Sequence, residues 1–293
     1  MISASIKNSI ESYLREVNNR RVKIKYHTDL QAGTFNKTCL LETSAGTYFL
    51  KHNQLNQYPK IFEKEAKGLR LLAATETVCV PEVIFYDQSS SESFILLEYI
   101  HPAEQNETFW DNFGRTMAKL HQRSNDYFGL DHDNYIGPMQ QINIPHELWT
   151  DFFVEERLER LVKKARDEKM IDNSLVSNFD NLYSNLTEFF PPEPPALLHG
   201  NLWDRNYIAS YHGDACVVDP SVYYGHREMD IAMTHLIDDF DERFYDTYNE
   251  TAPLEEGWKE RMDIYNLYPL LVLLHLGHYE YIEQINKTLK RFS

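Results

Sequence analysis

Residues 197–219 read LLHGNLWDRNYIASYHGDACVVD. An apolar pair leads into a polar loop that contains Asn201 and Asn206, and a short apolar strand over 215–218 then ends at Asp219. Amide and carboxylate oxygens are hard ligands of the kind that Mg²⁺ prefers. The interpretation of the remaining chain depends on this segment.

The spacing in this segment resembles the catalytic loop and metal-binding segment of the protein-kinase-like phosphotransferases. In that fold a loop residue orients the attacking hydroxyl, an Asn five residues later binds magnesium, and an Asp after the next strand binds magnesium again. The corresponding residues here are Asn201, Asn206 and Asp219. The first of these positions is normally Asp, so Asn201 departs from the pattern.

The longer strings narrow the resemblance to one family. LLHGNLWDRN, followed by VVDPSVYYGHREMDIAM, resembles the fructosamine kinase (ketosamine-3-kinase) family, whose loop usually reads HGDLW, two small residues and Asn. The similarity extends from about Tyr48 to Met233 and more weakly beyond. It implies an α+β, two-lobed, protein-kinase-like fold that uses ATP and Mg²⁺, with a small antiparallel β-sheet lobe and a larger helical lobe.

The length of the chain agrees with a kinase-like enzyme, and its charge disfavours a nucleic-acid-binding or membrane-binding protein. The chain has 293 residues, enough for one large domain or two lobes. Asp and Glu number 45 against 29 Lys and Arg, which gives a net charge of −16. Such an acidic chain is a poor partner for nucleic acid or an anionic membrane. Because the overall charge repels ATP, the nucleotide must bind in a local cationic pocket. Separately, we expect the protein to be a monomer.

Cysteine usage and hydropathy predict a cytoplasmic protein. Cys39, Cys79 and Cys216 are spread singly, without a CxxC pair, which favours a reducing compartment. The N-terminus lacks the long apolar core of a signal peptide. The most apolar run, 270–276, is far shorter than the ~20 residues that span a bilayer.

We predict the small lobe over residues 1–101, with five antiparallel strands. The apolar stripe of residues 61–74 indicates a helix, and Glu65 lies beside that stripe. Lys51 ends a strand, where a lysine usually extends into solvent. The family resemblance implies instead that Lys51 contacts the nucleotide phosphates and pairs with Glu65.

Two further nucleotide contacts are implied by the resemblance. Gly33 lies in a turn where kinases place a glycine-rich loop, although a single glycine is a weak motif that is usually structural. Glu98, Tyr99 and Ile100 end a strand just before His101-Pro102. The resemblance implies that their backbone groups bind adenine at the hinge between lobes, and an ordinary strand end is the alternative.

We predict the helical catalytic and substrate lobe over residues 102–293. His121 is expected to be a buried polar residue of this lobe and not a metal ligand, and His146 has no partner at metal-ligand spacing. One long helix is expected over 146–168, with Phe153, Arg157, Leu161 and Lys164 along one row. Asp230 matches a position that, in the resembled fold, supports the catalytic loop backbone.

The loop residues determine what chemistry is available. A carboxylate can accept a proton from the substrate hydroxyl, but the amide of Asn201 can only orient that hydroxyl, and general-base help is typically worth ~10²–10⁴-fold. Asp204 is a candidate replacement base. Trp203 is a candidate substrate contact through its ring and indole N–H, or simply a core aromatic.

The resemblance implies a protein-repair kinase that phosphorylates the 3-hydroxyl of ketosamines. Its acceptors would be fructosamine, ribulosamine or erythrulosamine adducts, as small molecules or on glycated protein lysines. The phosphorylated adduct breaks down and returns the amine. Two alternatives remain: a catalytically impaired nucleotide-binding homologue, which Asn201 favours, and a small-molecule kinase of the aminoglycoside or choline type.

Overall fold

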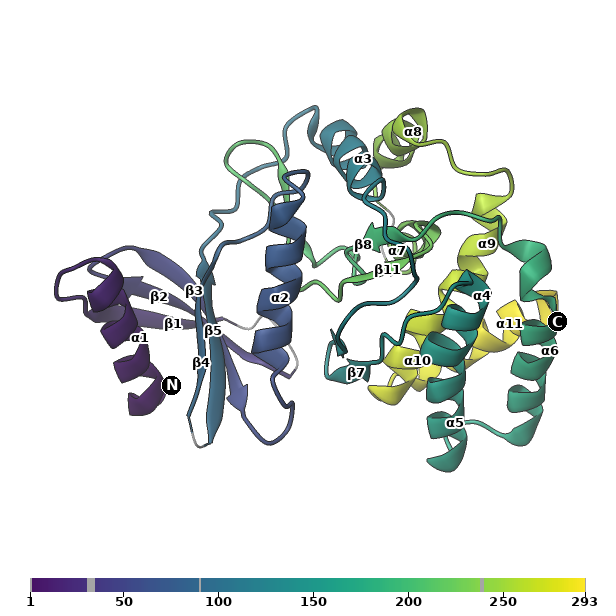
Figure 1. Ribbon diagram of the computed structural model, residues 1–293, viewed down its shortest axis with the longest axis horizontal. Helices are drawn as coiled ribbons and strands as arrows, with labels where there is room; N and C mark the ends of the chain where they lie inside the picture. The colour runs from purple at the N-terminus through teal and green to yellow at the C-terminus, as the bar shows by residue number, and fades with distance from the viewer. Residues whose placement is uncertain (1, 31–34, 90, 238–239, 293) are drawn as a thin grey trace. The chain divides into compact units, whose positions relative to one another are not determined.

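The structure is a computed structural model that describes residues 2–30, 35–89, 91–237 and 240–292 (Figure 1). The chain divides into two compact units. Unit 1 comprises Met1–Asn106 and Ile208–Asp219, and unit 2 comprises Glu107–Tyr207 and Pro220–Ser293. The segment Ile208–Asp219 therefore packs with residues that precede it by more than a hundred positions.

Unit 1 is built on one antiparallel sheet of five strands, in the order β1-β2-β3-β5-β4. The strands are β1 (Ile24–Leu30), β2 (Lys37–Thr43), β3 (Thr47–Gln54), β4 (Val83–Gln88) and β5 (Glu92–Glu98). The expected number of strands and their antiparallel pairing are confirmed. A short pair, β9 (Tyr207–Ala209) and β10 (Ala215–Val217), lies farther along the chain.

Helices α1 (Ala4–Val17) and α2 (Ile61–Ala74) cover opposite faces of this sheet (Figure 1). Successive residues of a strand point to opposite faces. On β3, Leu50 belongs to the apolar cluster that includes Ile6 and Ile10 of α1, whereas Lys51 bonds to Glu65 of α2. Strand alternation therefore carries Lys51 to the α2 face.

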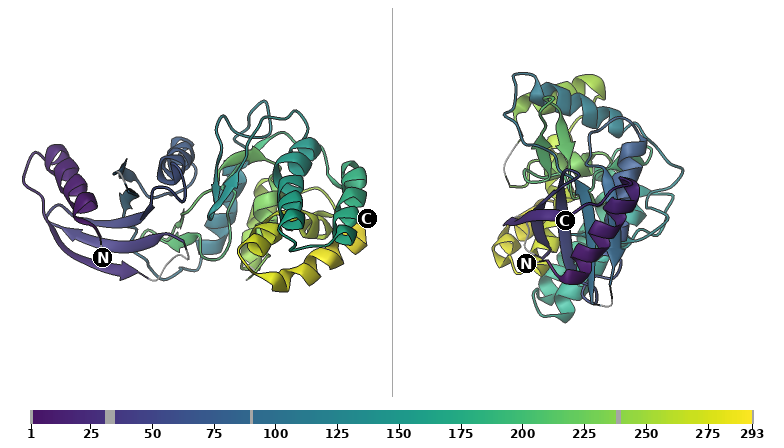
Figure 2. Two further views of the ribbon diagram at one scale, coloured as in Figure 1. Left: turned by 90° about the horizontal axis from the view of Figure 1, so that it is seen from below. Right: turned by 90° about the vertical axis from the view of Figure 1, so that its left-hand side faces the viewer.

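Unit 2 is mainly helical. Its longer helices are α3 (Phe109–Leu120), α5 (Arg160–Asp167), α6 (Asn173–Phe189), α8 (Glu242–Thr251), α9 (Trp258–Tyr265), α10 (Leu267–His275) and α11 (Ile282–Phe292). The shorter ones are α4 (Trp149–Phe152), α7 (Glu228–Met233) and η2 (Tyr279–Tyr281). Helices α6 and α11 pack side by side, with the rings of Phe189 and Phe292 at 5.3 Å (Figure 2).

Two short antiparallel strand pairs lie in unit 2. Strand β8 (Ala196–Leu198) pairs with β11 (Tyr223–Gly225), and β6 (Asn134–Ile136) pairs with β7 (Met139–Gln141). The loop predicted to be catalytic follows β8 directly, so its first residue begins from a fixed strand end.

The single helix expected over residues 146–168 is interrupted in its centre by a π-helical segment. It consists of α4, a π-helical segment η1 (Phe153–Glu159) and α5. A π-helix turns more slowly per residue than an α-helix, so the face that points inward shifts along the chain. Arg157 and Leu161 of the expected row are buried, but Lys164 is exposed.

The structure pairs two of the three cysteines that lie singly in the sequence. Cys79 and Cys216 form a disulfide within unit 1, and only Cys39 is free among the described cysteines. The two partners are 137 positions apart, and the backbone nitrogen of Val217 also donates to the carbonyl of Cys79 at 2.9 Å. The pairing could not be predicted from the spacing of the cysteines, because Cys216 comes close to Cys79 only when the chain folds. No helix in the described part of the chain has the length and apolarity needed to cross a bilayer.

Candidate active site

Unit 1 brings three of the predicted site residues together. The ammonium of Lys51 lies 2.7 Å from a carboxylate oxygen of Glu65 and also forms an ion pair with Asp219. The Lys51 and Glu65 side chains are only 6% and 10% exposed, while Asp219 is 47% exposed. A cation held between two carboxylates, one open to solvent, is suited to receive a phosphate group.

The backbone at Asp219 is unusual. Its φ is +55°, a left-handed conformation that non-glycine residues adopt rarely, although Asp does so more readily than most. The residue follows β10, which the Cys79–Cys216 bridge and the Val217 bond hold in unit 1. These contacts determine where the Asp219 carboxylate meets Lys51.

Unit 2 carries the loop that follows β8. Gly200 has a φ of +76°, and an added Cβ would overlap the carbonyl oxygen of Ser221. Glycine is therefore required at this position for both conformation and space. The backbone nitrogen of Ser221 donates to the carbonyl of His199 at 2.9 Å, so the loop and the segment after Asp219 are tied together.

Asp230 supports this loop from within the core of unit 2. Its carboxylate is completely buried and accepts hydrogen bonds from the backbone nitrogens of His199 at 2.7 Å and Gly200 at 2.8 Å. His121 Nε2 lies 3.1 Å from the same carboxylate. These contacts are those of the scaffold role expected for Asp230, with His121 behind it as a buried polar residue.

The sequence did not reveal what holds His121. Its Nδ1 lies 2.7 Å from the hydroxyl of Tyr248 on α8. Burial raises the pKa of Tyr248 above its usual value, so the phenol stays protonated. Its O–H group therefore donates a hydrogen bond to Nδ1 of His121. His121 then donates from Nε2 to Asp230, which fixes the tautomer of the imidazole.

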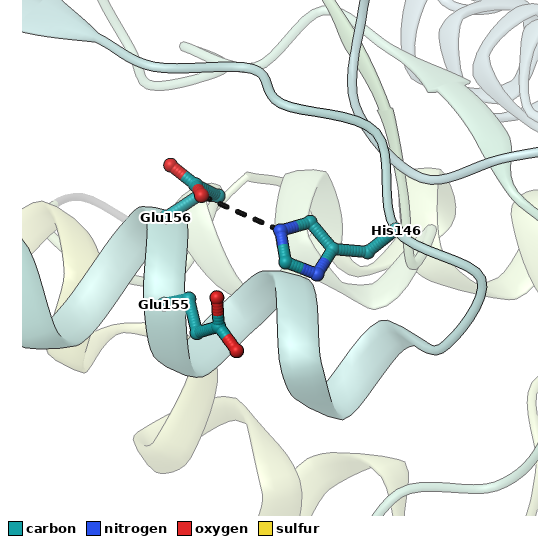
Figure 3. A group of neighbouring side chains, drawn as sticks. All are labelled: His146, Glu155 and Glu156. Carbon is teal, nitrogen blue, oxygen red and sulfur yellow. Dashed lines mark hydrogen bonds and ion pairs between the residues drawn. The ribbon is translucent and has the colours of Figure 1, made fainter.

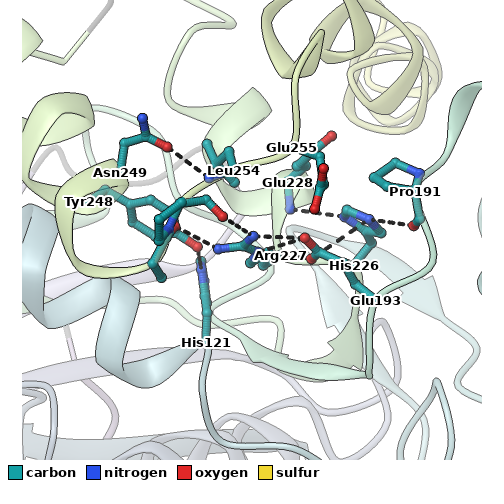
Figure 4. A network of polar contacts seen from close by, with 12 residues as sticks. His121, Pro191, Glu193, His226, Arg227, Glu228, Tyr248, Asn249, Leu254 and Glu255 are labelled. Atoms are coloured by element: carbon teal, nitrogen blue, oxygen red, sulfur yellow. Dashed lines mark hydrogen bonds and ion pairs between the residues drawn. The ribbon is translucent and has the colours of Figure 1, made fainter.

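Tyr248 is linked in turn to an ion pair between Arg227 and Glu193 (Figure 4). Arg227 donates to Glu193 through Nε at 2.8 Å and through Nη2 at 2.7 Å. Burial disfavours the charged form of Glu193, yet the hydrogen bonds from Arg227 hold its pKa below the usual value. The proline-rich segment 191–195 is therefore anchored to unit 2 through Glu193.

Asn201 and Asn206 are joined inside the loop. The side-chain nitrogen of Asn206 donates to the main-chain carbonyl of Asn201 at 2.7 Å, and both residues are more than nine-tenths buried. This bond fixes which end of the Asn206 amide is the oxygen. That oxygen and the carboxylate of Asp219 are the hard donors that Mg²⁺ requires, so the residues present fit this metal.

Trp203 and Asp204 lie on the more open side of the same loop. Both are half-buried, unlike the fully buried Leu202 between Asn201 and Trp203. Asp204 faces the exposed Arg205 at 4.0 Å. The partial exposure of Trp203 disfavours the core-aromatic alternative, because a core residue at this position would be covered as Leu202 is.

The residues expected to bind adenine end the sheet of unit 1. Glu98 is the last residue of β5, and its backbone nitrogen donates to the carbonyl of Glu82 at 2.9 Å. Tyr99 and Ile100 follow without regular structure, and the Tyr99 ring meets that of His101 at 4.8 Å. Gly33 lies outside the described residues.

A second group of possible metal ligands was not anticipated. His146, Glu155 and Glu156 place ligand atoms within 4.8 Å of one another (Figure 3). However, the buried Glu156 already accepts hydrogen bonds from Arg160 at 2.8 and 3.3 Å and lies 3.4 Å from His146 Nε2. This carboxylate has its counter-ion within the protein, so we interpret the group as an ion-pair network.

Comparisons with known proteins agree with the resemblance seen in the sequence. A family model described as "Fructosamine kinase" matches residues 6–293. A "Probable ketoamine kinase" of Vibrio parahaemolyticus is 36% identical over 267 residues, which cover 89% of this chain and 90% of that protein. A second one, from Enterococcus faecium, is 34% identical over 262 residues, covering 89% and 92% of the two chains.

Solved structures give the same result for the fold. A "Putative fructosamine-3-kinase" from Haemophilus somnus superposes with a TM-score of 0.85 at 33% identity, covering 96% of this chain and 94% of that one. An aminoglycoside phosphotransferase superposes with a TM-score of 0.64 at 13% identity, covering 98% and 99%. The expected α+β, protein-kinase-like fold is confirmed.

Proposed function

The chain belongs to the fructosamine kinase family, and we propose that it transfers the γ-phosphoryl group of ATP to the 3-hydroxyl of a ketosamine. The observation that carries the proposal is the ion-pair arrangement of Lys51 with Glu65 and Asp219. A lysine so held is preorganised for phosphate, because its position is set before the nucleotide arrives.

In this proposal residues 1–101 form the nucleotide-binding lobe and residues 102–293 the catalytic and substrate lobe. Lys51 contacts the phosphates and Glu65 orients Lys51. Gly33, which lies outside the described residues, keeps its expected role as a backbone contact to the phosphates. The backbone of Glu98, Tyr99 and Ile100 binds adenine.

Asn206 and Asp219 would hold Mg²⁺ through one amide oxygen and one carboxylate oxygen. Bound there, Mg²⁺ supplies neutralisation of the phosphate charge. The chain's own contribution is to fix the two ligands: Asn206 through its bond to the Asn201 carbonyl, and Asp219 through the hydrogen bond from the Val217 backbone nitrogen to the Cys79 carbonyl, which holds β10.

The acceptor hydroxyl is oriented by Asn201. Its amide oxygen can accept a hydrogen bond from the hydroxyl but cannot take the proton away. Asp204 is the carboxylate in the same loop that could do so, and its partial exposure leaves it open to an acceptor. Trp203, also half-buried, offers an aromatic surface to the sugar.

The acceptors we propose are ribulosamine, erythrulosamine or fructosamine adducts, free or on glycated lysines. Phosphorylation at the third hydroxyl leads to breakdown of the adduct and release of the amine, which is a protein-repair reaction. We propose that it acts as a monomer in the cytoplasm. Disulfides are rare in that compartment, so Cys79 and Cys216 would be present there mainly as adjacent thiols.

The test is a steady-state assay of ADP release with ATP, Mg²⁺ and a panel of the three ketosamines. A Lys51→Met variant serves as the control for nucleotide-dependent turnover, and an Arg20→Met variant as the control for loss of an exposed cation. Turnover on at least one ketosamine, lost in Lys51→Met and kept in Arg20→Met, supports the proposal. Turnover on aminoglycosides or choline alone would replace it with the related small-molecule kinase activity.

A second function is favoured by one observation, the amide at position 201. A homologue that binds Mg²⁺–ATP without transferring phosphate would keep Lys51, Glu65, Asn206 and Asp219 and lack only the base. This alternative predicts nucleotide-dependent thermal stabilisation with no ADP release on any acceptor.

A further inference from the structure

Arg157, at the centre of the π-helical segment η1, is completely buried. Its guanidinium donates to the carbonyl of Ile142 at 2.5 Å and to Oδ1 of Asn143 at 2.6 Å. Among the described residues, every hydrogen-bond acceptor found for this side chain is uncharged. A buried cation without a carboxylate partner is expensive, so its retention calls for an explanation.

Aromatic rings take the place of a counter-ion. The guanidinium carbon lies 4.4 Å from the ring centre of Phe152 and 4.1 Å from that of Tyr223, with Tyr268 at 5.4 Å. The electron-rich faces of these rings stabilise a desolvated cation. The planar guanidinium can stack on rings and donate at its edges at the same time, which an ammonium cannot do.

The acceptor of Arg157 begins a chain of buried amides. Asn143 donates through Nδ2 to Oδ1 of Asn134 at 3.1 Å, and Asn134 donates to the carbonyl of Val222 at 2.7 Å. Gln141 donates to the carbonyl of Ser221 at 3.0 Å. Nδ2 of Asn143 also donates to the carbonyl of His132 at 3.0 Å, and Gln141 also donates to Oδ1 of Asn134 at 2.8 Å. A primary amide has both donors and an acceptor, so each residue in the chain helps to orient the next.

The far end of this chain is the segment directly after Asp219. The carbonyls of Ser221 and Val222 are held by Gln141 and Asn134, and the Ser221 hydroxyl donates to the carbonyl of Tyr135 at 2.7 Å. The Ser221 backbone nitrogen donates to His199 in the loop after β8. Ser221 thus has all its polar backbone groups bonded, two residues beyond the proposed magnesium ligand.

We infer that Arg157 is a positioning residue for the magnesium–nucleotide site, acting through Asn143 and Asn134 on the backbone of Ser221 and Val222. The inference rests on the proposed function, because it requires Asp219 to bind magnesium. Arg157 fixes the acceptor side of Asn143, Asn143 fixes Asn134, and Asn134 fixes the backbone next to Asp219. Groups that orient metal ligands in this indirect way are usually worth about 10–100-fold in metal affinity or activity.

Replacement by methionine separates this role from simple packing. Met is of similar length and apolar, so Arg157→Met removes the buried charge together with its desolvation penalty, and the stability of the fold need not fall. It removes the donor to Oδ1 of Asn143, whose amide is then held only by the bonds that Nδ2 donates to the carbonyl of His132 at 3.0 Å and to Asn134 at 3.1 Å. The matched control is Arg166→Met, the same change at an exposed arginine of α5 whose ion pair is with the exposed Asp167.

The experiment measures two quantities for the parent chain, Arg157→Met and Arg166→Met. The first is hydrogen exchange of the Ser221 amide, which reports local opening of its bond to His199. The second is the Kd of a non-hydrolysable ATP analogue with and without Mg²⁺. We expect Arg157→Met to accelerate exchange and weaken magnesium-dependent binding by about tenfold, with binding in the absence of Mg²⁺ unchanged. Arg166→Met should resemble the parent.

Unchanged exchange at Ser221, or an equal loss of affinity with and without Mg²⁺, overturns the inference. If Arg157→Met does not fold, Asn134→Ala replaces it, because that change removes the donor to the Val222 carbonyl without adding a buried charge, and the same results are expected. If the parent chain binds no nucleotide at all, the proposed function is wrong, and the exchange result alone then decides whether Arg157 positions Ser221.

Discussion

The carboxylate of Asp230 accepts a hydrogen bond from the backbone nitrogen of His199 at 2.7 Å, and Asp230 is completely buried. The same carboxylate bonds to Gly200 and His121. A buried anion is tolerated when donors surround it, and here two of the three donors belong to the loop that carries the proposed catalytic residues. The stability of unit 2 and the shape of this loop therefore depend on one charged group.

Asp230→Asn should lower the free energy of unfolding by about 2–3 kcal/mol, because hydrogen bonds to a charged acceptor are lost and an amide NH₂ faces backbone N–H donors. Urea unfolding followed by tryptophan fluorescence measures the change. Asp263→Asn is the control, since Asp263 is 47% exposed and pairs only at the surface with Arg291. Equal stability of the two variants would contradict the anchoring role.

The Glu193–Arg227 pair predicts a pH dependence. The pKa of Glu193 is lower in the folded protein than usual, so folding releases a proton that the unfolded chain binds more readily. Its contribution is complete above the unfolded pKa of about 4.3 and is lost as the pH falls through the folded pKa. Glu193→Gln should therefore flatten the acid limb of the stability curve.

The measurement is the unfolding free energy at closely spaced values from about pH 6 to pH 3, the window in which this carboxylate becomes protonated. Glu188→Gln, an exposed change on α6, should keep the parent's slope. If Glu193→Gln and the parent lose stability in parallel, the ion pair does not carry the pH dependence.

Oxidation of the Cys79–Cys216 pair should stabilise unit 1. The bridge closes a segment of 137 positions, and cross-links over long segments are worth about 2–5 kcal/mol, with a size that depends on the model used for the unfolded chain. We expect the melting temperature to fall when dithiothreitol is added, and Cys79→Ser to abolish this response. Cys39→Val should preserve it, because Cys39 is not bridged. A response to dithiothreitol that survives in Cys79→Ser would disprove the pairing.

The sequence was sufficient for the sheet and for helix α2 because both show strong periodicity. Alternation along β3 separates Leu50 from Lys51, and the apolar stripe of α2 leaves Glu65 at its margin. The Lys51–Glu65 contact itself came from the family resemblance, since a lysine at a strand end has no distinctive local pattern.

The remaining contacts could not be predicted because they join distant positions through uncharged or common residues. His121 and Tyr248 are 127 positions apart, and Cys79 and Cys216 are 137 apart. Arg157 looked like one member of a helical row, and only the π-helical turn and the surrounding rings show that it is buried as a cation. Local periodicity reports which face is apolar and says nothing about which polar residue that face will meet.

Asp219→Ala should weaken magnesium-dependent nucleotide binding more than Asp204→Ala does. Asp219 is proposed to bind the metal directly and already contacts Lys51, whereas Asp204 faces only Arg205 at 4.0 Å. Loss of a ligand leaves phosphate charge uncompensated. Calorimetric titration with a non-hydrolysable ATP analogue, with and without Mg²⁺, compares the two variants. An equal loss in both, or a larger one in Asp204→Ala, would mean that the metal ligands are misassigned.

The most direct test of the catalytic proposal is Asn201→Asp, which supplies the carboxylate that the loop lacks. The two side chains are nearly isosteric, and the bond that Asn206 donates goes to the main-chain carbonyl of residue 201, so the substitution leaves it intact. Turnover on a ketosamine should rise by at least about tenfold, within the ~10²–10⁴-fold range of general-base catalysis. The matched change Asn206→Asp should give no such gain, because residue 206 is proposed to bind the metal.

The size of the gain also decides the role of Asp204. If Asp204 is the working base of the parent, Asp204→Asn abolishes the residual rate, and adding Asn201→Asp to that variant restores it, because the restored carboxylate takes over the proton. If the parent and Asn201→Asp both bind ATP and both fail on every ketosamine, the missing base is not the obstacle. The chain is then a nucleotide-binding homologue or acts on a different acceptor, and the transferase proposal is wrong.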